Sequence, residues 1–152
     1  MFAALGVEIK LAPGQSAALR EQALRDAEQA HQQFPLSRMI AHLYADAMID
    51  NGKLAEATAY LRDQAQSYRQ DARIHELLAK GYAAQGKLAL QHISLAEYYA
   101  LAGGKKAALD QLLIARKSAD ASFYDMALID AREREWKEQV REEMKDAPKE
   151  KN

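Results

Sequence analysis

A short segment of the chain, NGKLAEA, occupies residues 51–57, and a close variant, QGKLALQ, occupies residues 85–91. The glycines of these two segments, Gly52 and Gly86, are 34 residues apart. A recurrence at this spacing indicates a repeated helical unit, because each unit of a repeat protein buries its apolar side against its neighbours. The repeat constrains the fold more strongly than any other feature of the sequence.

Small and large apolar residues recur at equivalent distances from the two glycines. The first unit has Tyr44, Ala45, Met48, Ala57 and Leu61, and the second unit has Leu78, Ala79, Tyr82, Gln91 and Leu95. Small residues let paired helices approach closely, and larger apolar side chains fill the remaining space. The glycine suits the left-handed conformation that ends many helices. The pattern resembles the tetratricopeptide repeat, although Gln91 stands where a small residue is expected.

The register extends to both sides of these two units. Towards the N-terminus, three alanines and a proline fit the second helix of a preceding unit: Ala23, Ala27, Ala30 and Pro35. Towards the C-terminus, Gly103 repeats the glycine only 17 residues after Gly86. We therefore expect the helix over about 87–101 to be both the second helix of one unit and the first helix of the next. The predicted units span about 2–35, 38–69, 72–101 and 89–118.

The predicted fold is an all-α, right-handed solenoid of helix hairpins. Helix-forming residues such as Ala, Leu, Gln, Glu and Lys dominate the sequence, and 152 residues are the size of one domain. We expect residues 1–147 to form this repeat domain and residues 148–152 to be a disordered tail.

A capping helix is predicted at the C-terminal end of the solenoid, over residues 122–146. Ser122 is placed to cap its start. Its period puts four apolar residues on one side: Phe123, Met126, Ile129 and Trp136. The many charged residues towards its end suit a helix whose outer face meets water.

Charge and composition argue against several functions. The 21 basic and 22 acidic residues are mixed along the chain and give a net charge of −1, which does not suit nucleic acid. The absence of cysteine excludes disulfides and thiolate metal ligands. His75 and Glu76 open an HE dipeptide, but Ala79 stands where the second histidine of a zinc-binding HExxH would be. We predict no catalytic residue, no metal and no cofactor.

The hydropathy of the sequence argues against a membrane-embedded segment. No apolar run approaches the ~20 residues that a spanning helix needs. The opening segment, MFAALGVEIKLAPG, lacks the basic start of a secretory signal, so we expect it to form structure. Because the helical pattern begins abruptly, we expect the chain to be part of a longer protein.

The remaining candidate site is the concave face that the first helices of stacked hairpins form. Solenoids bind segments of other proteins on such faces. In this register the face carries Met39, His42, Asp46, Ile49, Arg73, Glu76, Lys80 and Ala83. We expect Lys80 and Arg73 to contact a carboxylate, and Met39 and Ile49 to contact an apolar side chain. The alternative is that all of these are ordinary exposed helix residues.

Residues 92–135 carry a more specific resemblance. The segments AEYYALAG, KKAALDQLLIAR and FYDMALIDARERE look like the C-terminal end of BepA-like bacterial zinc metallopeptidases. Members of that family have an HExxH catalytic domain followed by a tetratricopeptide domain, and none of their catalytic residues has a counterpart here. The resemblance implies a periplasmic domain that helps such a peptidase meet outer-membrane proteins, or their assembly machinery, in quality control.

These inferences favour a non-catalytic domain for protein–protein interaction. Its expected partners are protein or peptide segments, including the linked peptidase domain and outer-membrane assembly proteins. One alternative is a stand-alone tetratricopeptide scaffold. Another is a structural domain whose concave face packs on the catalytic domain or on a second copy of the chain, as in a homodimer. An enzyme in its own right is disfavoured by the missing catalytic residues.

Overall fold

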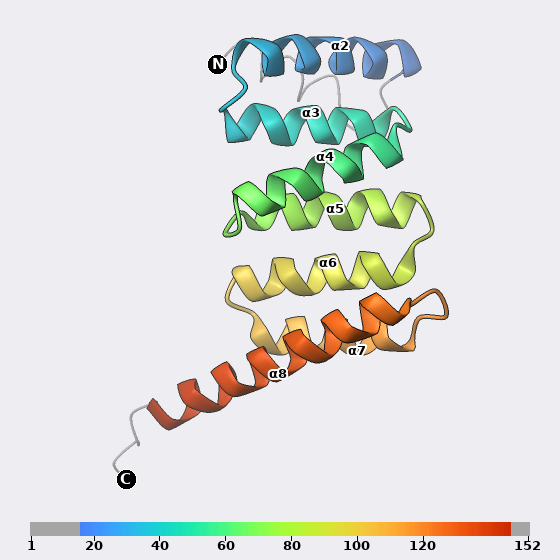
Figure 1. Cartoon of the computed structure of the whole chain (residues 1–152). Coiled ribbons are helices and arrows are strands. Elements are labelled where there is room, and N and C mark those ends of the chain that lie inside the picture. The colour runs from blue at the N-terminus through green and yellow to red at the C-terminus, as the bar shows by residue number, and fades with distance from the viewer. Residues whose placement is uncertain (1–15, 147–152) are drawn as a thin grey trace.

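The computed structural model describes residues 16–146, and every regular element in this range is an α-helix (Figure 1). The helices are α2 (Ala17–Gln33), α3 (Arg38–Asp50), α4 (Leu54–Ser67), α5 (Ala72–Ala84), α6 (Leu88–Leu101), α7 (Lys105–Lys117) and α8 (Phe123–Asp146). Short turns join them into a stack, so the predicted all-α solenoid is confirmed. The helix expected near the start of unit 2–35 and the tail expected over 148–152 lie outside the described residues.

The three glycines that mark the repeat end α3, α5 and α6 in the same way. Gly52, Gly86 and Gly103 have φ angles of 76°, 70° and 87°, in the left-handed region that glycine enters without steric cost. The amide of Gly52 donates to the carbonyl of Ile49 at 3.0 Å, and the next amide donates to Met48 at 2.9 Å. Equivalent bonds follow the other two glycines. These bonds satisfy carbonyls that a helix end leaves unpaired.

From α3 onwards the helices form two layers, and each front helix covers the furrow between two helices behind it. In the first half of the stack, α3 and α5 contact each other, and α4 contacts both. In the second half, α6 and α7 contact each other, and α8 contacts both. Figure 1 shows α4 and α8 crossing in front of the stack with a similar tilt.

The pair formed by α5 and α6 differs, because no helix of the described chain contacts both of them. After α5 the chain does not return to the front layer, and α6 lies beside α5 instead. Its sequence, LALQHISLAEYYAL, is apolar around most of the helix, which suits a position between α5 and α7. Gln91 and Leu95 are partly exposed, whereas Ala96 is fully buried. By its packing, α6 is the first helix of a new unit.

The core consists of two main clusters. The cluster between α3, α4 and α5 contains Ala45, Met48, Ile49, Ala57, Leu61, Ile74, Leu77, Leu78 and Tyr82. The cluster between α6, α7 and α8 contains Ile93, Ala96, Ala108, Leu112, Ala115, Ile129 and Trp136. Phe123 was predicted on the apolar side of α8 but is 84% exposed, because it lies about 120° around the helix from Ile129 at ~100° per residue.

Asp71 ties the start of α5 to α3. Its carboxylate accepts a hydrogen bond from the amide of Arg73 at 3.2 Å and so caps α5. The same carboxylate lies 3.1 Å from the Arg38 guanidinium and 2.9 Å from His42 Nε2. Asp71 is only 5% exposed, and these partners satisfy a buried charge.

The starts of α6 and α8 are also capped by side chains. Asp120, in the turn before α8, accepts from the amide of Ala89 at 3.1 Å and caps α6 from outside the helix. Ser122 caps α8 as predicted, because its hydroxyl accepts from the amide of Asp125 at 3.1 Å. The Asp125 carboxylate accepts from the Ser122 amide in return, at 2.8 Å.

The close approach of α4 to α5 at Gly81 gives a first prediction. A Cβ at Gly81 would lie 2.8 Å from Thr58 Cγ2 and 3.6 Å from Ile49 Cδ1, and the first distance is shorter than a van der Waals contact. We expect Gly81→Ala to lower the free energy of unfolding by about 1 kcal/mol, because overpacking outweighs the gain in helix propensity. Urea denaturation followed by circular dichroism measures this change.

Thr58→Ser provides the matched control for this prediction. Serine lacks Cγ2 but keeps the hydroxyl that Thr58 donates to the Leu54 carbonyl at 2.9 Å. In the Thr58→Ser background, Gly81→Ala should be neutral or stabilising. An equal loss of stability in both backgrounds would show that crowding against Thr58 is not the cause.

Candidate functional site

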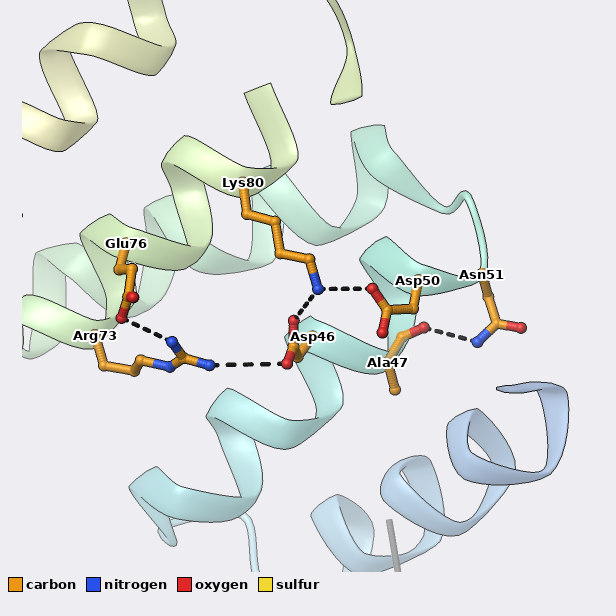
Figure 2. Close-up of polar contacts among 7 residues, drawn as sticks. All are labelled: Asp46, Ala47, Asp50, Asn51, Arg73, Glu76 and Lys80. Carbon is orange, nitrogen blue, oxygen red and sulfur yellow. Dashed lines mark hydrogen bonds and ion pairs between the residues drawn. The ribbon is translucent and has the colours of Figure 1, made fainter. Parts of the chain in front are cut away.

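The face formed by α3 and α5 carries the residues that the sequence predicted as a binding surface. Figure 2 shows an ion-pair network on this face. The ammonium of Lys80 lies 2.6 Å from both Asp46 Oδ1 and Asp50 Oδ1. The guanidinium of Arg73 lies 3.7 Å from Asp46 and 2.7 Å from Glu76. The structure thus brings four of the predicted residues together and adds Asp50 to them.

This network occupies the two cations that we expected to contact a carboxylate of the partner. Burial opposes the charged form of Lys80, but its hydrogen bonds to Asp46 and Asp50 raise the pKa of the ammonium above its ordinary value. Arg73 is held between Asp46 and Glu76. An incoming carboxylate would have to compete with these three acids, so the α3/α5 face does not favour an anionic ligand.

The other four predicted residues do not add a common ligand surface. Met39 and Ala83 are exposed, whereas His42 is engaged by Asp71. Ile49 is 6% exposed and packs in the core, so the prediction that it lines the surface is wrong. The reason is Gly81, whose missing side chain leaves room for Ile49 between α3 and α5.

A second surface, the α4/α8 groove, lies over the pair α5 and α6, which no helix within residues 16–146 covers. It is an open depression of about 450 Å³. Four helices and one turn line it: α4 with Arg62, Ala65 and Gln66; the turn after α4 with Arg69; α5 with His75, Leu78 and Tyr82; α6 with Leu90, Ile93, Ser94 and Glu97; and α8 with Leu128 and Arg132. In Figure 1, α4 and α8 stand on either side of α5 and α6.

The middle of the α4/α8 groove is apolar. Leu78, Tyr82 and Ile93 form its floor and are nearly buried in the core below. Leu90 is partly buried, and Leu128 on α8 remains 41% exposed. Concave apolar surface that stays in contact with water favours association with an apolar group.

The charged residues of the groove differ in whether they are paired. Arg132 on α8 lies 2.5 Å from Glu97 and 2.8 Å from Glu135. Burial opposes its charge, but these two acids raise the pKa of Arg132 above its ordinary value. Arg62 on α4 and Arg69 in the turn after α4 are exposed and form no ion pair with any residue of the range 16–146. The α4 wall therefore presents free positive charge to the groove.

The groove is absent from the sites predicted from the sequence, because its walls belong to helices that are distant in the chain. Gln91 is the signal that points to it. In the preceding unit the equivalent residue is Ala57, which is fully buried and lets α4 pack on the back layer. A glutamine cannot replace it in a close helix crossing, so α6 takes another position.

The comparison with known families agrees with this fold. A family model described as tetratricopeptide repeat matches residues 20–81, which run from α2 into α5. The tetratricopeptide resemblance is thereby supported for residues 20–81 of the chain. No curated protein matches the chain.

The described residues also lack a metal-binding group and a membrane-spanning helix. No group of histidine, aspartate or glutamate side chains within residues 16–146 is arranged to hold a metal ion. None of the described helices is long and apolar enough to cross a membrane.

His75 in the groove gives a second prediction, on stability and pH. Burial lowers the pKa of His75 below its ordinary value of 6.5, Glu97 opposes this shift, and Arg132 adds to it. Because the unfolded chain binds this proton more tightly, stability is full above pH ~6.5 and falls as the pH drops through the lower folded pKa. We expect His75→Gln to reduce the loss of unfolding free energy between pH 7 and pH 5, as measured by urea titrations. An unchanged loss in the variant would contradict this assignment.

Proposed function

We propose that this chain is a non-catalytic protein-interaction domain that binds a segment of another protein in the α4/α8 groove. Tetratricopeptide domains commonly serve as interaction modules. The observation that supports this site is the combination of exposed apolar side chains with unpaired cations in a concave surface. The α3/α5 face lacks this combination, because ion pairs within the chain already engage Arg73 and Lys80.

The groove has the physical properties of a recognition site. Its floor is preformed, because Leu78, Tyr82 and Ile93 also pack in the two core clusters. A preformed floor lowers the conformational cost of binding. The free arginines Arg62 and Arg69 orient an oppositely charged segment and favour its fast association. Affinity and orientation thus come from different residues of the same groove.

Selection from a random peptide library displayed on phage tests this proposal. The immobilised full chain is the target, and selected peptides are measured by fluorescence anisotropy. We expect Leu128→Asp to weaken their binding at least about tenfold, because it places a charge on the apolar wall. Met39→Asp makes the same kind of change on α3 and serves as the matched control, since Met39 is exposed outside the groove.

Two results would overturn the proposal. Selected peptides that bind Leu128→Asp as well as the native chain, but lose affinity for Met39→Asp, would place recognition on the α3/α5 side. A library that yields no binder to the folded chain would argue against an interaction domain altogether. Circular dichroism of both variants establishes that they remain folded.

We also propose, from the resemblance of residues 92–135, that the chain works beside a BepA-like zinc metallopeptidase in the periplasm. In this arrangement the α3/α5 face packs on the catalytic domain, while the α4/α8 groove remains open to outer-membrane proteins or their assembly partners. The exposed Met39 and the ion-pair network on α3 and α5 suit a mixed apolar and polar contact of this kind.

Calorimetric titration of the purified chain with the catalytic domain of a BepA-like peptidase tests this second proposal. We expect one-to-one binding that Met39→Asp weakens and Leu128→Asp leaves unchanged. If the two domains do not associate at micromolar concentration, or if only Leu128→Asp weakens the complex, this arrangement is wrong. The groove proposal is independent of that result.

A further inference from the structure

We propose that the segment which fills the α4/α8 groove is an acidic amphipathic helix that completes the front layer of the solenoid. This inference rests on the proposed function and specifies the chemical class of the partner. It draws on three independent features of the groove: its place between the layers, the bonding state of its backbone groups, and the sign of its unpaired charge.

The layer arrangement leaves space for one helix. Each front helix covers a furrow, α4 over α3 and α5 and α8 over α6 and α7, but the furrow between α5 and α6 has no cover within the described chain. A helix in this furrow would lie between α4 and α8 (Figure 1). Helices pack about 8–10 Å apart when side chains interdigitate, so it would contact all four helices that line the groove.

The backbone argues for a helix and against an extended segment. Every residue that lines the groove except Arg69 lies in an α-helix, whose amide and carbonyl groups bond within the helix. The groove therefore offers no strand edge to which an extended peptide could add. An extended segment would leave its own backbone groups unpaired over the apolar floor, whereas a helix satisfies them internally.

The charge of the groove selects an acidic partner. Arg62 and Gln66 line the groove from α4, one helical turn apart, and Arg69 lines it from the turn that follows α4. On the opposite wall, Arg132 already neutralises Glu97. Asp125, which acts electrostatically on Tyr82 from the first turn of α8, is engaged by Ser122.

The charge that remains uncompensated is thus positive and lies on one wall. A helix that fits the groove presents an apolar stripe to Leu90 and Leu128. It also presents carboxylates on the flank that meets Arg62 and Arg69. Guanidinium groups bind carboxylates with directional hydrogen bonds, so this flank fixes how the helix is rotated in the groove.

Three synthetic peptides test the inference. Each has about 15 residues, which as a helix spans ~22 Å, and an apolar stripe at positions i, i+3, i+4 and i+7. The first peptide has glutamates beside the stripe, and the second has lysines there. The third equals the first except for a central proline, which disrupts a helix. Binding of each labelled peptide to the full chain is measured by fluorescence anisotropy.

We expect the acidic peptide to bind at least about tenfold more tightly than the basic peptide and than the proline peptide. Arg62→Glu combined with Arg69→Glu should reverse the preference between the acidic and the basic peptide. Lys106→Glu combined with Arg134→Glu is the matched control, because both residues are exposed, lie outside the groove and give the same change in net charge. This control should leave the tenfold preference in place.

Other outcomes overturn the inference and separate it from the proposed function. Equal binding of the proline peptide would show that the occupant is not helical, and equal binding of the basic peptide would show that charge does not select it. If these peptides fail but library peptides still require Leu128, the groove is a site for another class of segment. A dimer in light scattering that Leu128→Asp dissociates would identify a second copy as the occupant. If no peptide of either kind depends on the groove, both proposals are wrong.

Discussion

The structure depends on how closely a front helix can approach the two helices behind it. At α4 this approach is possible because Ala57 is small and fully buried and because Gly81 on α5 has no side chain. The space left at Gly81 admits Thr58 from α4 and Ile49 from α3, so three helices meet around one missing Cβ. Close packing of this kind supplies dispersion contacts and apolar burial without long side chains.

The arrangement of the layers changes at α6, which lacks this small residue. α6 carries Gln91 at the position equivalent to Ala57, and it lies beside α5 instead of in front of it. The chain then restarts the pattern one half-unit later, with Ala96 buried as in a first helix. The α4/α8 groove is the direct consequence of this restart, because none of the described helices α2 to α8 lies in the furrow in front of α5 and α6.

Local features of the fold could be predicted from the sequence, because they depend on a few neighbouring residues. The turns at Gly52, Gly86 and Gly103 require a left-handed residue, and the helix start at Ser122 requires only a capping side chain. The burial of the small alanines could be predicted from their distances along the chain to these glycines. Phe123 is exposed, contrary to the prediction, because it lies about 120° around α8 from the buried Ile129.

The candidate site could not be predicted in the same way, because tertiary proximity decides it. Nothing in the local sequence shows that Lys80 lies between Asp46 and Asp50, or that Glu97 pairs with Arg132. On the α3/α5 face, acids of the same chain pair with Arg73 and Lys80. In the α4/α8 groove, Arg62 and Arg69 stay unpaired within the described chain, and no sequence motif marks them.

Within residues 16–146, a single pair of helices, α5 and α6, joins the two halves of the solenoid. Contacts between helices α2 to α5 and helices α6 to α8 of the described chain are confined to α5 and α6. The hydrogen bond from the Ala89 amide to the Asp120 carboxylate ties α6 to the turn between α7 and α8. Because α4 belongs to one half and α8 to the other, the angle at which α5 and α6 pack decides how wide the space between α4 and α8 is. A segment held there would therefore set the curvature of the whole solenoid.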